Sequence, residues 1–143
     1  MLNFKNTYTK EELKNILVKN QMTRTKAKIS IINELIQAKH PISIQELHQK
    51  LGVKSCHLST VFRAMQQFKN KNLVREINFG EDFCRYELIT NDDKDHIRCR
   101  TCGTFEKIEK IKVKNFEETI SKMGFSDMTY RLDLSGVCPH CIT

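Results

Sequence analysis

The sequence predicts an α+β protein, with an N-terminal winged helix-turn-helix domain at residues 1–90 and a small α/β domain at residues 91–143. Three observations predict this fold class. Helical periodicity dominates residues 9–70, two strand-like segments follow, and paired cysteines mark the rest of the chain. A chain of 143 residues is long enough for one or two small hydrophobic cores.

The first two helices are predicted from capping signals and apolar spacing. The sequence TKEE at Thr9–Glu12 has the form of a capping box, and an amphipathic helix follows it. A second helical pattern extends from about Thr25 to Ala38, and the pair His40–Pro41 ends it. The apolar faces comprise Leu13, Ile16 and Leu17 in the first helix and Ile29, Ile32 and Ile36 in the second.

The next two helices and the strands after them have the order of a winged helix. A second capping box, SIQE at Ser43–Glu46, starts a short helix that Gly52 ends. After the turn at residues 53–56, the segment HLSTVFRAMQQFKNKN forms a longer helix. Its apolar stripe comprises Leu58, Val61, Met65 and Phe68. Segments 73–79 and 83–89 are typical of two strands around the loop GED, which completes the winged-helix pattern.

The net charge of +7 is concentrated in the N-terminal half of the chain. Residues 1–85 contain 15 Lys and Arg against 7 Asp and Glu, a net charge of +8, whereas residues 86–143 contain 9 against 10, a net charge of −1. A basic half predicts a polyanionic partner, and double-stranded DNA suits the helix-turn-helix pattern. The alternative is a solvated basic surface. The residues expected to contact DNA are Ser59, Thr60, Arg63 and Gln66 on the longer helix, and Lys26 on an earlier one.

Four cysteines in the C-terminal half have the spacing of a metal site. Cys99 and Cys102 form one CxxC pair, and Cys138 and Cys141 form another, with 35 residues between the pairs. Four thiolates presented by two tight turns suit structural zinc, and Gly103 directly after the first pair suits a sharp turn. A domain of about 50 residues is marginal without a staple, a metal or a partner. The alternatives are a thioredoxin-like redox pair and independent unpaired thiols.

The composition disfavours several other classes of protein. The first 15 residues are polar and include acidic side chains, so they do not resemble a secretory signal. No apolar run approaches the roughly 20 residues that a membrane span needs, and we expect a cytoplasmic protein without a membrane partner. An enzyme is not expected, because no nucleophile and base are visibly paired and four cysteine ligands leave zinc no open position for water.

The order of these parts resembles the ferric uptake regulator (Fur) family of bacterial metal-sensing repressors, which includes iron, zinc, manganese and peroxide sensors. The segments that carry the resemblance are LSTVFRAMQQF, NLVREINF, RYEL and DHIRCRTCG. The resemblance implies a homodimer held by the α/β half, with structural zinc in the four-cysteine site. It also implies a second, regulatory metal at the hinge, which fixes the two winged helices at the spacing of a palindromic operator and so controls metal homeostasis genes.

The sequence departs from the family pattern at several positions. Phe62 replaces a tyrosine in the DNA-reading helix, and TRTK at Thr23–Lys26 replaces a T-x-x-R motif. The run Asp93-Lys94-Asp95-His96 stands where the family often has H-H-D-H, and Tyr130 stands near the place of a late histidine. We therefore expect one family metal subsite to be absent or altered.

The resemblance leaves enough candidate ligands for one regulatory site. They are His96, Glu87, His40, Cys84, Asp95 and Glu106. A thiolate from Cys84 would favour zinc over iron or manganese, which suggests a regulator of the zinc uptake type. The alternatives are that Glu87 and Asp95 are solvated charges, that His40 is a surface residue and that Cys84 is a core thiol.

Two other functions remain compatible with the same fold. One is a zinc-stabilised peroxide or redox sensor, in which the thiols or a histidine-bound iron react and DNA is released. The other is a DNA-binding regulator without a metal response, in which the hinge site has degenerated and only structural zinc remains.

Overall fold

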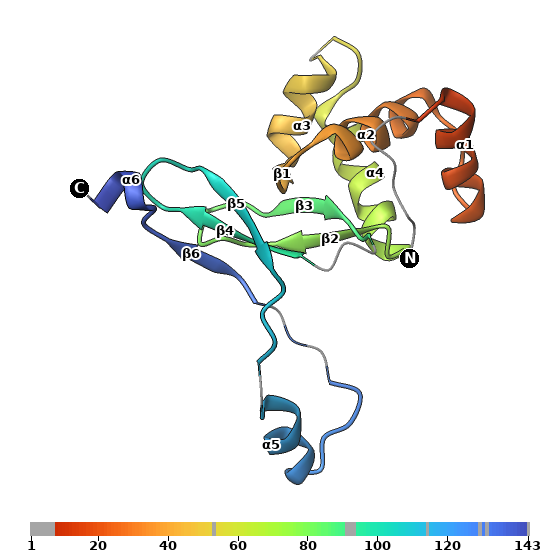
Figure 1. Ribbon diagram of the computed structural model, residues 1–143. Coiled ribbons are helices and arrows are strands. Elements are labelled where there is room, and N and C mark those ends of the chain that lie inside the picture. The colour runs from red at the N-terminus through yellow and green to blue at the C-terminus, as the bar shows by residue number, and fades with distance from the viewer. Residues whose placement is uncertain are drawn as a thin grey trace. The chain divides into compact units, whose positions relative to one another are not determined.

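The computed structural model describes residues 8–52, 54–90, 94–113, 115–128, 130 and 132–142. The chain divides into two compact units, an N-terminal unit at Met1–Asp92 and a C-terminal unit at Asp93–Thr143. Their helices and strands are labelled in Figure 1. Among the described residues, no helix combines the length and the apolar character that a membrane crossing requires.

Four helices form most of the N-terminal unit. They are α1 at Lys10–Lys19, α2 at Lys26–Gln37, α3 at Ile44–Leu51 and α4 at Leu58–Asn70. Both predicted capping boxes are confirmed: Thr9 and Glu12 exchange side-chain and backbone hydrogen bonds at the start of α1, and Ser43 and Glu46 do so at the start of α3. Gly52 ends α3 with a φ of 90°, a conformation that residues with a Cβ rarely adopt.

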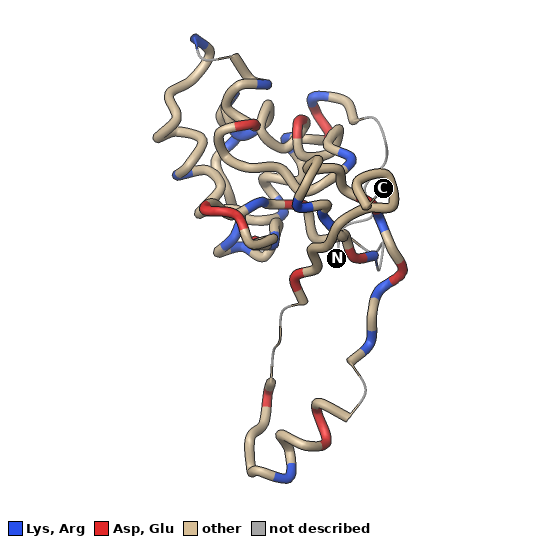
Figure 2. The backbone as a smooth tube through the Cα atoms, turned by 90° about the vertical axis from the view of Figure 1, so that its left-hand side faces the viewer, with Lys and Arg blue, Asp and Glu red and all other residues tan. Residues whose placement is uncertain are grey.

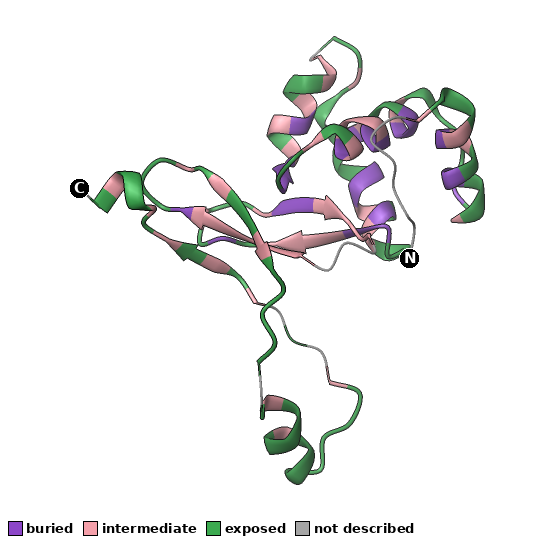
Figure 3. Ribbon diagram, in the orientation of Figure 1, coloured by how far each residue is buried: buried purple, intermediate pink, exposed green. Residues whose placement is uncertain are grey.

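The hydrophobic core of the N-terminal unit joins these helices to a small sheet, and the buried residues of Figure 3 mark it. Its fully buried members include Leu17, Ile31, Ile32, Leu47, Met65 and Phe68. Burial of each such side chain stabilises the fold by about 1.5–3 kcal/mol. The prediction that Leu58 belongs to the buried stripe of α4 is wrong: it lies in the first turn and is 44% exposed, while Ala64 is buried.

The sheet of the N-terminal unit has three antiparallel strands in the order β1-β3-β2. They are β1 at Ile42–Ser43, β2 at Val74–Ile77 and β3 at Arg85–Leu88. The two longer strands lie within the predicted segments, and residues 78–84 between them form what we call the wing loop. The short strand β1, which pairs Ile42 with Tyr86, was not predicted from the sequence.

The C-terminal unit contains a second three-stranded sheet, in the order β5-β4-β6. Its elements are β4 at Lys94–Cys99, β5 at Phe105–Glu109, α5 at Phe116–Lys122, β6 at Leu134–Gly136 and α6 at Pro139–Ile142. β4 pairs antiparallel with β5 and parallel with β6.

Two predictions for the C-terminal unit need correction. The sequence around Met128–Leu134 predicts the last strand, but that strand begins at Leu134, and residues 129 and 131 lie outside the described residues. The polar run NDDKD predicts a joint between the two domains at residues 91–95. Residues 91–93 lie outside the described residues, whereas Lys94 and Asp95 already belong to β4. The polar composition of Lys94 and Asp95 suggested a loop, but the pairing of β4 with β5 includes both residues in the sheet.

Candidate metal centre and DNA-binding surface

Strand pairing gathers the four predicted cysteine ligands into one cluster. Cys99 ends β4, and the parallel pairing of β4 with β6 sets it opposite Gly136, two residues before Cys138. The Sγ atoms of Cys99, Cys102, Cys138 and Cys141 all lie within 4.8 Å of one another. A tetrahedral zinc site with Zn–S bonds of about 2.3 Å has S–S edges of about 3.8 Å. The Sγ atoms of Cys102 and Cys138 lie 3.8 Å apart.

Tight turns and backbone N–H groups hold the first sulfur in place. The N–H of Gly103 donates to the carbonyl of Cys99 at 2.9 Å, and Gly103 has a φ of 76°, which confirms the predicted sharp turn. Cys99 Sγ accepts from the N–H of Cys102 at 3.5 Å and from the N–H of Cys138 at 3.3 Å. Since Cys102 and Cys138 come from different CxxC pairs, the four sulfurs form one site and not two separate redox pairs.

The electrostatics of the cluster differ between its sulfurs: they lower the pKa at Cys99 and Cys102 and raise it at Cys141. Hydrogen bonds from the backbone of Cys102, and then of Cys138, lower the pKa of Cys99 to about 5. The Thr104 hydroxyl, 3.1 Å from the Cys102 sulfur, lowers the pKa of Cys102. A hydrogen bond with Cys138 raises the pKa of Cys141 to about 12. Because zinc binds thiolates and displaces their protons, zinc affinity is expected to rise with pH.

The candidate regulatory ligands of the N-terminal unit lie in three different environments. His40 is exposed, and its Nδ1 lies 2.9 Å from the Pro41 carbonyl. Glu87, in β3, forms an ion pair with Arg75 of β2. Cys84 packs half-buried against the core, and burial, followed by the charge of Glu76, raises the pKa of its thiol. Burial thus favours the neutral thiol of Cys84 over the thiolate that a metal needs.

The candidates of the C-terminal unit lie on its sheet. His96 and Asp95 are neighbours in β4, and Glu106 in β5 pairs with Ile97. Successive strand residues point to opposite faces, so His96 points to one face while Asp95 and Glu106 belong to the other. The Asp95 carboxylate accepts the N–H of Ile111 at 3.0 Å. A site centred on His96 therefore does not gain Asp95 or Glu106 from its own sheet.

The four cysteines stand apart from the other candidates. In the part of the chain that the structure describes, they are the one group of His, Cys, Asp and Glu side chains close enough to hold a metal ion. The regulatory site accordingly stays a prediction.

Helix α4 presents one polar face to solvent. Ser59 and Arg63 are exposed on it, whereas Thr60 and Gln66 are half-buried. Lys26 is exposed at the start of α2. Ser59, Arg63 and Gln66 follow one another at spacings of four and three, which places them on one face of the helix.

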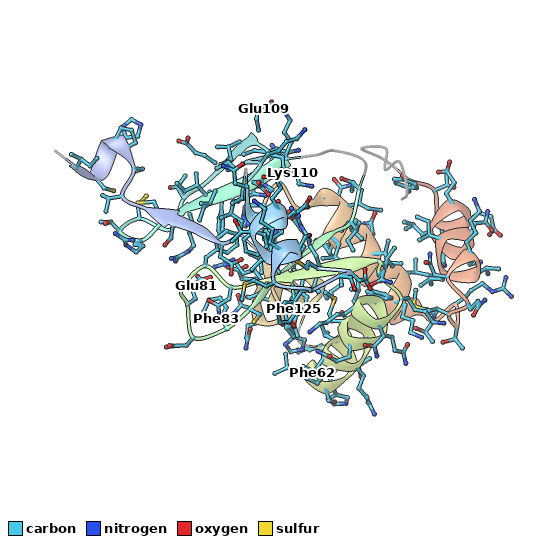
Figure 4. All side chains as sticks on the ribbon, turned by 90° about the horizontal axis from the view of Figure 1, so that it is seen from below. Phe62, Glu81, Phe83, Glu109, Lys110 and Phe125 are labelled. Atoms are coloured by element: carbon cyan, nitrogen blue, oxygen red, sulfur yellow. The ribbon has the colours of Figure 1, made fainter. Side chains whose placement is uncertain are left out.

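An exposed aromatic residue extends this face beyond the predicted set. Phe62, labelled in Figure 4, is 51% exposed and precedes Arg63. An apolar side chain at such a position can contact a thymine methyl group in the major groove. The exposure of Phe62 could have been predicted from the sequence, because this residue does not belong to the apolar stripe of α4.

Similarity to known proteins identifies the family of this chain. A sequence profile of the ferric uptake regulator family matches residues 4–135. The chain belongs to the ferric uptake regulator family. The relatives of this chain in the family are transcription regulators. The expectation that the chain is not an enzyme is therefore confirmed.

Curated relatives in the Fur family differ in the signal they are named for. The chain is 29% identical to the zinc uptake regulation protein of Mycobacterium tuberculosis over 122 residues, covering 83% of this chain and 92% of that protein. It is 27% identical to the ferric uptake regulation protein of Legionella pneumophila over 121 residues, covering 82% and 89%. It is 25% identical to the peroxide-responsive repressor of Staphylococcus aureus over 115 residues, covering 78% and 77%.

Solved structures confirm the predicted fold class. The ferric uptake regulator of Helicobacter pylori matches with a TM-score of 0.73 at 19% identity, covering 98% of both chains. The ferric uptake regulator of Vibrio cholerae matches with a TM-score of 0.66 at 26% identity, covering 87% of this chain and 98% of that one. The Fur fold therefore extends over both units.

Proposed function

We propose that this Fur-family protein is a metal-responsive repressor of metal homeostasis genes that binds a palindromic DNA operator as a cytoplasmic homodimer. The observation that carries the proposal is the exposed polar face of α4, presented by a winged helix in the basic half of the chain. The four-cysteine cluster in the other unit supports the metal-binding part of the proposal, because its sulfur geometry fits zinc.

The local electrostatics of α4 suit an approach to DNA. Its first turn contains no acidic residue, and no side chain caps its N-terminus. The positive end of a helix dipole attracts phosphate, and Lys and Arg residues along the chain, blue in Figure 2, add to that attraction. We propose that Arg63 and Thr60 reach base edges in the major groove, that Ser59 and Gln66 flank them, and that Lys26 contacts a phosphate.

Replacing Arg63 by alanine is expected to weaken sequence-specific binding. The measurement is fluorescence anisotropy with a duplex that the zinc-loaded wild-type protein selects from a random pool (the selected duplex). Loss of a base-edge contact should cost about 1–3 kcal/mol on that duplex and little on random DNA. Lys26→Ala is the matched control, and it should weaken binding to both duplexes and reduce the salt slope by about one unit. Unchanged affinity of Arg63→Ala for both duplexes would show that Arg63 does not read the groove.

The C-terminal unit supports a homodimer because its described residues form no core of their own. Among its described residues only Cys99 is buried, and α5 has no buried residue. Its exposed apolar side chains are Ile111, Val113, Met123, Phe125, Tyr130, Val137 and Ile142. A second copy would cover such a surface, and structural zinc would supply the remaining stability of so small a unit.

For the regulatory site we propose His96 as the central ligand and Glu87 as its partner. His96 lies three residues before Cys99 on β4, so zinc bound at the four-cysteine cluster would hold His96 in place. Glu87 is paired with Arg75, so a bound cation would compete with that arginine for the carboxylate. His40 and Cys84 remain candidates for the other ligands, and Asp95 and Glu106 are less favoured because of their strand face. A metal held by ligands of both units would restrict the hinge, and we propose zinc in preference to iron or manganese.

A further inference from the structure

One guanidinium joins the wing loop and the strand that follows it to the start of α3, 39 positions earlier in the sequence. Arg85 of β3 is 5% exposed. Its Nε and Nη2 atoms donate to the two carboxylate oxygens of Glu81, in the wing loop, at 2.7 and 2.9 Å. Its Nη1 atom donates to Glu46 Oε2, in the first turn of α3, at 2.8 Å and to the Pro41 carbonyl at 3.3 Å. Arg85 thus holds the wing loop and the start of α3 against one strand.

The two carboxylates both bind Arg85 but differ in exposure, since the Glu46 side chain is 40% exposed. The Glu81 side chain is only 8% exposed, although it belongs to a loop. Figure 4 labels Glu81 and Phe83 on that loop, and the Phe83 ring covers the Arg85 guanidinium at 5.3 Å from its centroid. Glu46 Oε2 also accepts the N–H of Ser43 at 3.1 Å, so the same oxygen closes the capping box of α3.

Such an ion cluster determines geometry more than it adds stability. Burying charges costs desolvation energy that offsets most of their attraction. A bidentate arginine–carboxylate pair, in contrast, fixes both partners in direction as well as distance. The wing loop carries Glu81 and Asp82 and no Lys or Arg, so its own charge does not attract DNA. A contribution of this loop to DNA affinity would therefore come from neutral contacts, such as those of backbone N–H groups, and would depend on the position in which the loop is held.

We propose that Arg85 is a positioning residue for DNA binding. It fastens the wing loop to α3, and α3 packs beside α4, so that the wing and the DNA-facing helix meet the duplex as one rigid surface. The inference rests on the proposed DNA-binding function and adds a residue that does not itself touch DNA.

The sharpest test compares two substitutions that remove the same negative charge from adjacent residues. Glu81→Gln removes the bidentate ion pair with Arg85, whereas Asp82→Asn changes the exposed side chain of the next residue. Simple electrostatics predicts equal or tighter DNA binding for both variants. The positioning role predicts a loss on the order of tenfold for Glu81→Gln, equivalent to about 1.4 kcal/mol, and none for Asp82→Asn. Affinity is measured on the selected duplex, at a temperature where circular dichroism shows each variant folded.

A second variant keeps the test independent of the Glu81 substitution. Arg85→Lys preserves the positive charge but cannot bind both carboxylates in a planar fork, and it should also lose on the order of tenfold. Hydrogen exchange of the free protein should show faster exchange at residues 79–83 and unchanged exchange in α2. Wild-type affinity in both Glu81→Gln and Arg85→Lys would overturn the positioning role. A wild-type protein that binds no duplex would instead contradict the DNA-binding function.

Discussion

Replacing Cys99 by serine is expected to remove the structural zinc and, with it, the fold of the C-terminal unit. Cys99 is the one buried residue among those described in this unit, and two backbone N–H groups hold its sulfur. The binding free energy of a structural zinc ion, about 10–16 kcal/mol in small zinc domains at neutral pH, is folding free energy where the metal takes the place of a core. The dimer should therefore dissociate as well. Cys138→Ser should behave in the same way.

Three measurements on the purified variants check this prediction. Mass spectrometry of the metal gives zinc per chain, circular dichroism gives the fold, and light scattering gives the mass. Cys56→Ser is the matched control, since Cys56 is a half-buried cysteine outside the cluster and its replacement should leave one zinc per chain. A Cys99→Ser protein that remains a folded dimer without zinc would show that the cluster is not structural.

Replacing His96 by alanine is expected to abolish the metal response of DNA binding while the fold survives. If His96 centres the regulatory site, metal binding and DNA affinity are coupled by about 1–3 kcal/mol, which is about 5- to 150-fold in affinity. Affinity for the selected duplex is measured with and without added zinc, on protein that retains its structural zinc. The wild-type protein should gain affinity on zinc addition, and His96→Ala should keep only the basal affinity.

A histidine outside the proposed site provides the control for this experiment. His140 is exposed in α6, and His140→Ala should respond to zinc as the wild type does, provided that its zinc content is unchanged. A full response in His96→Ala would place the switch elsewhere in the protein.

The sequence predicted best those features that local interactions determine. The capping boxes at Thr9 and Ser43 involve residues three apart, so the starts of α1 and α3 could be read directly. The spacing of the CxxC pairs likewise predicted the cluster, because a tight turn presents both sulfurs to one ion.

Features that depend on distant partners could not be predicted in this way. β1 has two residues and exists because Ile42 pairs with Tyr86, 44 positions away. The contact of Arg85 with Glu46 spans 39 positions, and no periodicity announces it. Leu58 fitted the helical spacing, yet it was predicted wrongly because periodicity does not show where a core ends. Likewise, the residues that share a sheet face with His96 are known only from the pairing of β4 with β5.

We expect two metal ions with different roles in each chain, and metal analysis before and after mild chelation distinguishes them. Wild-type protein is purified, loaded with zinc and its metal content measured per chain, then dialysed against a weak chelator and measured again. We expect one zinc ion that survives chelation, held by the four cysteines, and one divalent ion that is lost and can be restored. One retained zinc ion and nothing exchangeable would contradict the regulatory site and leave a DNA-binding regulator without a metal response.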